Sequence, residues 1–200
     1  MKRIYIVCSL AVFLMIGLGI TFFLIRDANA AIPASTTFIT QSGDTFNFGK
    51  DKTKLKLIEF IYTHCPDVCP TTTQKMVELK EDLVEKGIYG KDIEFVTITI
   101  DPYRDTTKVL QDYKKGFQIA NDDNWLFLTG KKQQIKENQR QLRKITNALQ
   151  FQYKDPGNGQ FIHSTFTYLV DEKNQYIDKF PMGKEFNKQE VYDKILKRLE

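Results

Sequence analysis

Two cysteines in the first half of the chain have the spacing of a functional site. Cys65 and Cys69 lie in the segment THCPDVCP, residues 63–70, which follows an apolar run and precedes a helical pattern. Pro70 has a backbone angle suited to a first helical turn, so we expect the helix to begin there with Cys69 as its cap. The partial positive charge at a helix N-terminus favours thiolates. Two thiolates in such a loop can bind one metal ion or form a disulfide with each other.

These cysteines could form a structural disulfide, a redox pair or part of a metal site. A purely structural disulfide would close so small a loop that it contributes only about 2 kcal/mol. A thioredoxin-type redox pair normally has the spacing Cys-x-x-Cys, and this chain has one residue more. Thioredoxin-like reductases also generally have a proline just before the strand that faces the cysteines, where this chain has Gln160-Phe161-Ile162-His163. A functional site is therefore favoured over a structural disulfide, and the spacing weakens the assignment as a thioredoxin-type redox pair.

A histidine in the expected facing strand supplies a third donor. Cys65, Cys69 and His163 together offer two thiolates and one imidazole, one protein ligand fewer than a structural zinc site has. Soft sulfur ligands favour Cu(I), and an added imidazole can also bind Cu(II). The donor set therefore predicts copper as the bound metal rather than structural zinc.

The chain begins with a segment that is typical of a membrane anchor. Residues 4–25 are 22 uncharged and mostly apolar residues, enough for a transmembrane helix across a hydrocarbon layer of about 30 Å. Because Lys2 and Arg3 precede this run, the remainder is expected on the extracytoplasmic side of the cell membrane. A signal peptide cleaved after Ala28-Asn29-Ala30 is the alternative. We therefore expect a single-pass anchor over 1–30, a linker over 31–37 and one domain over 38–200.

The rest of the sequence alternates between strand and helix patterns. A hairpin is expected around Ser42-Gly43-Asp44, and Asn187 is expected to cap a last helix. Between them we expect strands over 55–63, 93–100, 124–130 and 161–170, a further strand after the DEKNQ turn, and helices over 70–86, 106–115 and 131–147. This order predicts an α/β sandwich with a mixed central sheet, the thioredoxin-like architecture.

Composition narrows the function only by exclusion. The chain has 200 residues, 42% of them hydrophobic and 27% charged, which fits one globular domain with an appendage. Three cysteines are too few for a fold built on disulfides, and a formal net charge of +4 gives no indication of a nucleic-acid partner.

Three separated blocks carry a family resemblance. FIYTHCPDVCP at 60–70, TIDPYRDT at 99–106 and IHSTFTYLVD at 162–171 resemble the Sco/SenC family, whose name refers to synthesis of cytochrome c oxidase. The resemblance implies a membrane-anchored, thioredoxin-fold copper protein that helps to assemble the CuA centre of cytochrome c oxidase subunit II. It also implies that Cys65, Cys69 and His163 are the copper ligands.

Other candidate residues have weaker signals. His64 adjoins a predicted ligand, and we expect it to be a solvated loop residue. Asp101 ends the second buried strand, where it would either orient His163 or tune a thiol as an outer-shell group, or simply form a turn before Pro102. Asp105 is expected to cap the following helix, which leaves Arg104 as a loop residue without an assigned role.

Two functions from different classes follow from this reading. The first is a copper chaperone that takes up the ion at the reduced cysteines and passes it to a partner by ligand exchange; this function is not enzymatic. The second is a thiol–disulfide reductase acting on the partner's cysteines, with Cys65 as the attacking thiol and Cys69 as the resolving one. A redox disulfide between Cys65 and Cys69 would empty the metal site in either case.

Overall fold

The computed structural model describes residues 5, 10–21, 30–50 and 54–200. The chain divides into two compact units, Met1–Ala30 and Ala31–Glu200. In the first unit, residues 10–21 are helical. No helix in the described part of the chain has the length and apolar character needed to cross a membrane. The basic residues that flank the predicted anchor and most of its predicted cleavage signal lie outside the described residues.

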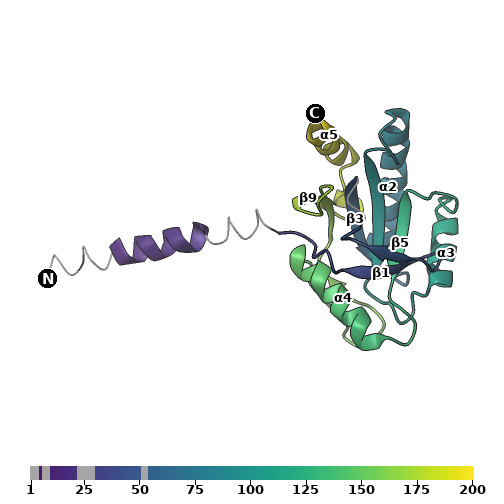
Figure 1. Cartoon of the computed structure of the whole chain (residues 1–200), viewed down its shortest axis with the longest axis horizontal. Helices are drawn as coiled ribbons and strands as arrows, with labels where there is room; N and C mark the ends of the chain where they lie inside the picture. Colours follow the sequence, from purple (N-terminus) through teal and green to yellow (C-terminus); the bar gives the residue numbers. More distant parts are fainter. Residues whose placement is uncertain (1–4, 6–9, 22–29, 51–53) are drawn as a thin grey trace. The chain divides into compact units, whose positions relative to one another are not determined.

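A seven-stranded mixed sheet forms the centre of the second unit (Figure 1). Its strand order is β2-β1-β5-β4-β3-β8-β9, with β3, β4 and β5 parallel and the outer pairs antiparallel. The strands are β1 (Thr37–Thr40), β2 (Thr45–Asn47), β3 (Leu55–Ile61), β4 (Ile93–Thr99), β5 (Trp125–Thr129), β8 (Phe166–Val170) and β9 (Tyr176–Pro181). The predicted hairpin before β3 and the mixed sheet are thus confirmed, as is the thioredoxin-like fold class.

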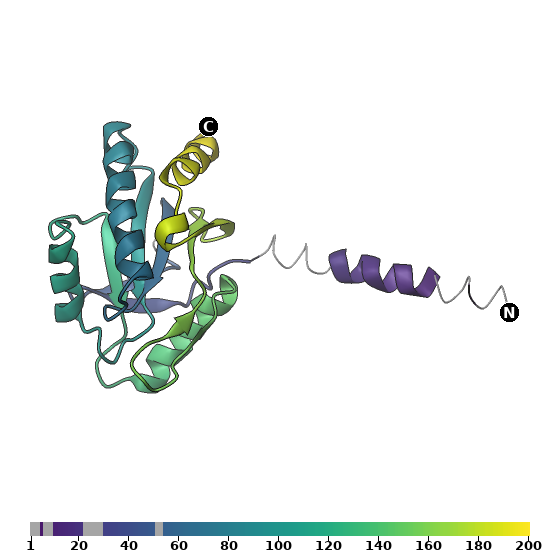
Figure 2. The ribbon, with the colours of Figure 1, turned by 180° about the vertical axis from the view of Figure 1, so that it is seen from behind.

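Four α-helices and one short 3-10 helix connect the strands of this unit. They are α2 (Val68–Glu85), α3 (Thr107–Gly116), α4 (Ile135–Ala148), η1 (Gly183–Glu185) and α5 (Lys188–Leu199). Asn187 caps α5 as expected, because its side chain accepts hydrogen bonds from the amides of Gln189 and Glu190. Figure 2 shows α2 in front of the sheet and α4 at its lower end.

Two adjacent residues of β3 show how the two faces of the sheet are covered. Glu59 points toward α2, where its carboxylate accepts a hydrogen bond from Thr73. The next residue, Phe60, points to the opposite face and stacks on Phe151, which follows α4. All seven residues of β3 are buried, as are all seven of β4, because these central strands have covered faces on both sides.

The helix that follows the cysteines packs on the sheet as its periodicity predicts, with one exception. Met76, Leu79 and Leu83 are fully buried. Val84, which adjoins Leu83 and would extend this apolar stripe, is instead 54% exposed, because it lies one position beyond the buried face. The core therefore holds α2 in place along most of its length, and with it the two cysteines at its start.

Candidate metal centre

The cysteine loop joins the end of β3 to the start of α2. It turns tightly, because the Cys65 amide donates to the Tyr62 carbonyl over 3.0 Å. The helix begins at Val68 with Asp67 as its N-cap residue, two positions earlier than expected, so Cys69 lies inside the first turn and is not the cap. Pro70 is tolerated there because first-turn amides have no partner within the helix.

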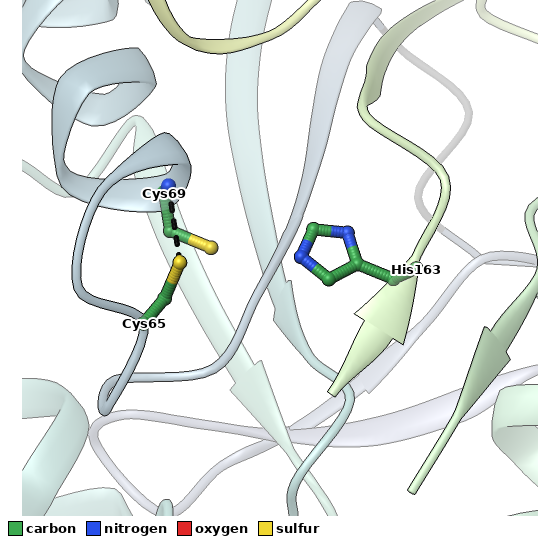
Figure 3. Close-up of side chains that lie close together, drawn as sticks. All are labelled: Cys65, Cys69 and His163. Atoms are coloured by element: carbon green, nitrogen blue, oxygen red, sulfur yellow. Dashed lines mark hydrogen bonds between the residues drawn. The ribbon is translucent and has the colours of Figure 1, made fainter. Parts of the chain in front are cut away.

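Both cysteines of this loop are free thiols. Cys69 is completely buried, whereas Cys65 retains 9% of its surface. The Cys69 amide donates to the Cys65 sulfur over 3.5 Å, which draws the two residues together (Figure 3). Cys65 is thus the more accessible of the two thiols, which fits the attacking role predicted for it in the reductase alternative.

His163 lies on a separate structure, which we name the histidine arm and define as residues 151–163. Its two short strands, β6 (Tyr153–Lys154) and β7 (Ile162–His163), pair with each other and not with the main sheet. The expected single strand over 161–170 is therefore wrong. The chain leaves β7 at Ser164, whose amide donates to the Gln152 carbonyl, and joins the main sheet only at β8.

The imidazole of His163 is oriented by one hydrogen bond and two aromatic rings. Its Nδ1 lies 2.8 Å from the Ser164 carbonyl, which can only accept, so Nδ1 carries the proton. The other nitrogen, Nε2, points toward the two sulfurs (Figure 3). Phe151 stacks on the ring and Tyr62 meets it edge-on, both with centroids 5.9 Å away. This tautomer is the one that a metal-binding imidazole requires.

The three predicted ligands come together in space. One ligand atom each from Cys65, Cys69 and His163 lies within 4.8 Å of the other two. Three donors around one ion, each at about 2.3 Å, would be about 4 Å apart, so a contraction of about 1 Å or less closes the site. The donor set of two sulfurs and one nitrogen suits a soft metal ion such as Cu(I).

The electrostatics of the site separate the two thiols. The hydrogen bond with the Cys69 thiol lowers the pKa of Cys65 well below its usual range; burial opposes this, and His163 and the amides of Asp67 and Cys69 add to it. The same hydrogen bond, together with burial, raises the pKa of Cys69. Burial lowers the pKa of His163, but the interactions with Cys65 and the Ser164 carbonyl outweigh it, so the net shift is upward. One thiolate and one thiol therefore face the imidazole.

The structure shows the surroundings of two weaker candidates, His64 and Asp101. His64 is exposed, as expected, and its Nδ1 lies 3.4 Å from the hydroxyl of its neighbour Thr63. Asp101 is almost completely buried, but its carboxylate pairs with Arg104. Within the described residues, no hydrogen bond joins Asp101 to His163 or to either thiol. In the described part of the chain, the Asp101 carboxylate therefore bonds to Arg104 and not directly to a predicted metal ligand.

Sequence reasoning missed two acidic residues near the site. Asp105 does not cap α3, whose N-cap is Thr106; instead its carboxylate accepts hydrogen bonds from the Thr63 amide and the hydroxyls of Thr63 and Thr99. Glu59 is fully buried in β3, two positions before the strand ends, and burial raises its pKa to about 8. The available signal for Glu59 was a carboxylate in a mostly apolar strand.

Comparisons with known proteins agree with this site. The family model described as SCO1/SenC matches residues 26–200. The SCO2-like protein of Rickettsia typhi is 40% identical over 152 residues, which cover 76% of this chain and 71% of that protein. The crystal structure of a SCO1/SenC family lipoprotein from Bacillus anthracis superposes with a TM-score of 0.74 at 25% identity, covering 86% of this chain and 96% of that one.

A second similar structure contains copper. It is yeast Sco1 with copper bound, which is 27% identical and superposes with a TM-score of 0.64 over 84% of this chain and 89% of that one. The family model covers most of the chain, and the Rickettsia relative exceeds 30% identity over most of the length of both proteins. This chain therefore belongs to the SCO1/SenC family.

Proposed function

We propose that this protein is a copper chaperone for assembly of the CuA centre of cytochrome c oxidase. The observation that carries the proposal is the convergence of Cys65, Cys69 and His163, with ligand atoms within 4.8 Å of one another. Membership of the SCO1/SenC family and the bound copper of yeast Sco1 support the choice of metal and of process. The partner in this proposal is the CuA domain of cytochrome c oxidase subunit II.

Copper uptake follows from the protonation states of the free protein. Cys65 offers a thiolate because its pKa is lowered, so it is the residue that first captures the ion. Cys69 must release its proton when it binds, which makes uptake more favourable at higher pH. The Nε2 of the neutral His163 imidazole completes the site without losing a proton, and because the pKa of His163 is raised, this step too is more favourable at higher pH.

Delivery follows from the unequal burial of the three ligands. Cys69 is completely buried, while Cys65 is partly accessible and His163 lies on an arm outside the main sheet. An incoming thiolate of the partner therefore reaches the ion from the side of Cys65 and His163. Ligand exchange would replace these two donors first and Cys69 last.

A thiol–disulfide reductase remains the second candidate, because one observation favours it. A low-pKa, partly exposed Cys65 beside a buried, protonated Cys69 is the arrangement of an attacking and a resolving thiol. This chemistry would act on a disulfide of the oxidase subunit and would not need His163 to bind a metal.

One experiment separates the two functions. The reduced, copper-loaded protein is mixed with the metal-free CuA domain of subunit II, prepared either with reduced cysteines or with a disulfide, and copper and free thiols are followed in both proteins. We expect copper transfer to the reduced domain from wild type and from His64→Ala, but not from His163→Ala. Transfer that persists in His163→Ala would contradict the chaperone proposal. Reduction of the disulfide form without copper, unaffected by His163→Ala, would favour the reductase.

We also propose that residues 4–25 anchor the protein in the cell membrane, with residues 38–200 as the extracytoplasmic domain. The support is the uncharged run and the basic pair before it. Protease treatment of intact spheroplasts tests this arrangement: the domain should be digested from outside, and its protection would contradict the proposal.

A further inference from the structure

The loop between β4 and α3, residues 101–105, contacts both halves of the metal centre. At one end of this loop, Asp105 is fully buried and accepts from the amide of Thr63 over 3.0 Å. Thr63 immediately precedes His64 and Cys65, so this bond holds the start of the cysteine loop. Asp105 also accepts from the Thr99 hydroxyl over 2.5 Å, which ties the same point to the end of β4.

Arg104 extends from the same loop in the other direction, to the histidine arm. Its Nε donates to the carboxylate of Asp101. Its Nη2 donates to the carbonyl of Gly159 over 2.9 Å, a contact between residues 55 positions apart in the sequence. Its guanidinium also lies over the ring of Phe161, 5.9 Å from the centroid. The arginine therefore touches the arm at two points within four residues of His163.

The contact with Phe161 continues to the imidazole through aromatic rings. Phe161 packs against Tyr62 with a centroid distance of 5.3 Å, and Tyr62 in turn meets the His163 ring at 5.9 Å. Tyr62 also accepts the backbone hydrogen bond of Cys65. A displacement of the 159–161 segment would therefore move the wall against which the imidazole rests.

The contribution of Arg104 to folding is expected to be small. Its side chain is 37% exposed, and an ion pair at such a position usually contributes only about 0–1 kcal/mol to stability. In contrast, Asp101 is 2% exposed, so the guanidinium is attached to a rigid point at the end of β4. An exposed arginine fixed at one end and bonded to a ligand-bearing arm at the other has the geometry of a positioning group.

We propose that Arg104, held by Asp101, is a positioning residue that sets the distance between the His163 imidazole and the two thiols. The inference rests on the proposed function, because it assumes that all three residues bind copper. Together, Asp105 and Arg104 make the 101–105 loop a brace between the cysteine loop and the histidine arm. The brace acts on the histidine; it leaves the two cysteines, which β3 and α2 hold, in place.

The test compares Arg104→Gln with wild type in the purified, reduced full-length protein. Cu(I) affinity is measured by competition with a chromophoric chelator, and the Cu(II) form is examined by electron paramagnetic resonance for nitrogen ligation. We expect Arg104→Gln to weaken copper binding by about 10- to 100-fold, the range typical of outer-shell groups, and to weaken the nitrogen signal. Arg104→Lys, which can keep one of the two polar contacts, should recover part of the affinity. Arg140→Gln removes an exposed arginine that pairs with Glu137 near the start of α4, and serves as the matched control.

A double-variant comparison shows whether Arg104 acts through His163. If it does, adding Arg104→Gln to His163→Ala causes no further loss of copper affinity. The midpoint potential of the Cys65–Cys69 disulfide should be the same in wild type and Arg104→Gln, which a general loss of structure would not allow. Should Arg104→Gln fail to fold, Asp101→Asn provides the same test, since it removes the charge that holds the guanidinium.

The outcomes distinguish this inference from the proposed function. Copper binding that is unaffected by Arg104→Gln but lost in His163→Ala overturns the inference alone. An equal loss from Arg104→Gln in the wild-type and His163→Ala backgrounds also overturns it, because the arginine would then act elsewhere. Failure of wild type itself to bind copper would overturn the proposed function.

Discussion

The cysteine loop and the histidine arm meet at one point but are supported very differently. The loop lies between β3, all of whose residues are buried, and α2, whose stripe of buried side chains packs on the sheet. The arm consists of two strands of two residues each, which pair only with each other. Its contacts to the rest of the domain include Phe151 stacked on Phe60, Tyr62 edge-on to the imidazole and the hydrogen bond from Arg104.

This difference suggests a division of labour between holding and releasing the ion. The thiols are fixed by the hydrophobic core, so their relative position survives loss of the metal. The third ligand lies on a strand pair outside the main sheet, which is tied to the core by side chains such as Phe151, so fewer backbone hydrogen bonds fix its distance from the sulfurs. A chaperone needs both properties, because it must bind the ion firmly and then transfer it.

The largest effect is expected from loss of a ligand on the rigid side. Cys65→Ala removes the only thiolate of the metal-free site, so copper should fall from about one ion per chain to nearly none. Metal analysis after gel filtration of the reduced protein measures this. Cys8→Ala, which changes the one other cysteine in the sequence, is the matched control and should retain the metal. Full copper loading of the Cys65 variant would contradict the ligand assignment.

The next effect concerns the reactivity of the two thiols. Below pH 8 an ordinary thiol, with a pKa of about 8.5, loses about tenfold in alkylation rate for each pH unit. Because the pKa of Cys65 is lowered, its alkylation by iodoacetamide should stay nearly constant between pH 5.5 and 7.5. Mass spectrometry at short reaction times, with His163→Ala alongside, measures the profile. A steep fall toward pH 5.5 would show that Cys65 is protonated.

Glu59 should affect the stability of the rigid side. Its pKa rises from the ordinary range to about 8 on folding, chiefly because of burial, so folding disfavours the charged form. The stability that folding gains from keeping this carboxyl neutral is complete below about pH 4.5, and it is lost as the pH rises through 8. Relative to wild type, Glu59→Gln should therefore gain a few kcal/mol in the free energy of unfolding between pH 5 and 8.

Urea denaturation of both proteins at several pH values measures this difference. Taking the difference between the two proteins cancels the titration of the groups that they share and that do not interact with Glu59; the interaction with Cys65 is the smallest of the causes of the Glu59 shift. If the difference stays constant across this pH range, the carboxylate is not held in its neutral form by burial.

The smallest effect is expected from packing in the histidine arm. Phe151→Leu keeps an apolar residue but removes the ring that stacks on the imidazole at an interplanar angle of 25°. Copper affinity should fall by less than about tenfold, since the hydrogen bond to Ser164 still orients the ring. The matched control is Phe46→Leu in β2, where the ring contacts Phe48. An equal loss in the control would assign the effect to general destabilisation.

The rigid side of the molecule was also the easier side to predict from sequence. The apolar runs that became β3 and β4 and the periodic residues Met76, Leu79 and Leu83 of α2 are local patterns, and the core contains them as expected. The cysteine spacing lies in the same segment. The local apolar pattern is sufficient here because the side chains that form the pattern are the same ones that the core buries.

The histidine arm and its brace were harder to predict for a physical reason. The polar residues Tyr153 and Lys154 form β6 only because β7 lies beside them, so no periodicity marks the strand. Asp105 was expected to cap α3, and its actual partner Thr63 is 42 positions away in the sequence. Such long-range polar contacts satisfy buried groups without leaving a local signal.

Copper K-edge X-ray absorption of the Cu(I)-loaded protein tests the central claim most directly. Only two histidines occur in the sequence, so His64→Ala and His163→Ala together identify any nitrogen donor. We predict two sulfur ligands and one nitrogen ligand per copper in wild type and in His64→Ala, with the nitrogen lost in His163→Ala. A wild-type spectrum with sulfur ligands alone, or a nitrogen ligand that persists without His163, would contradict the claim that the two regions close on one ion.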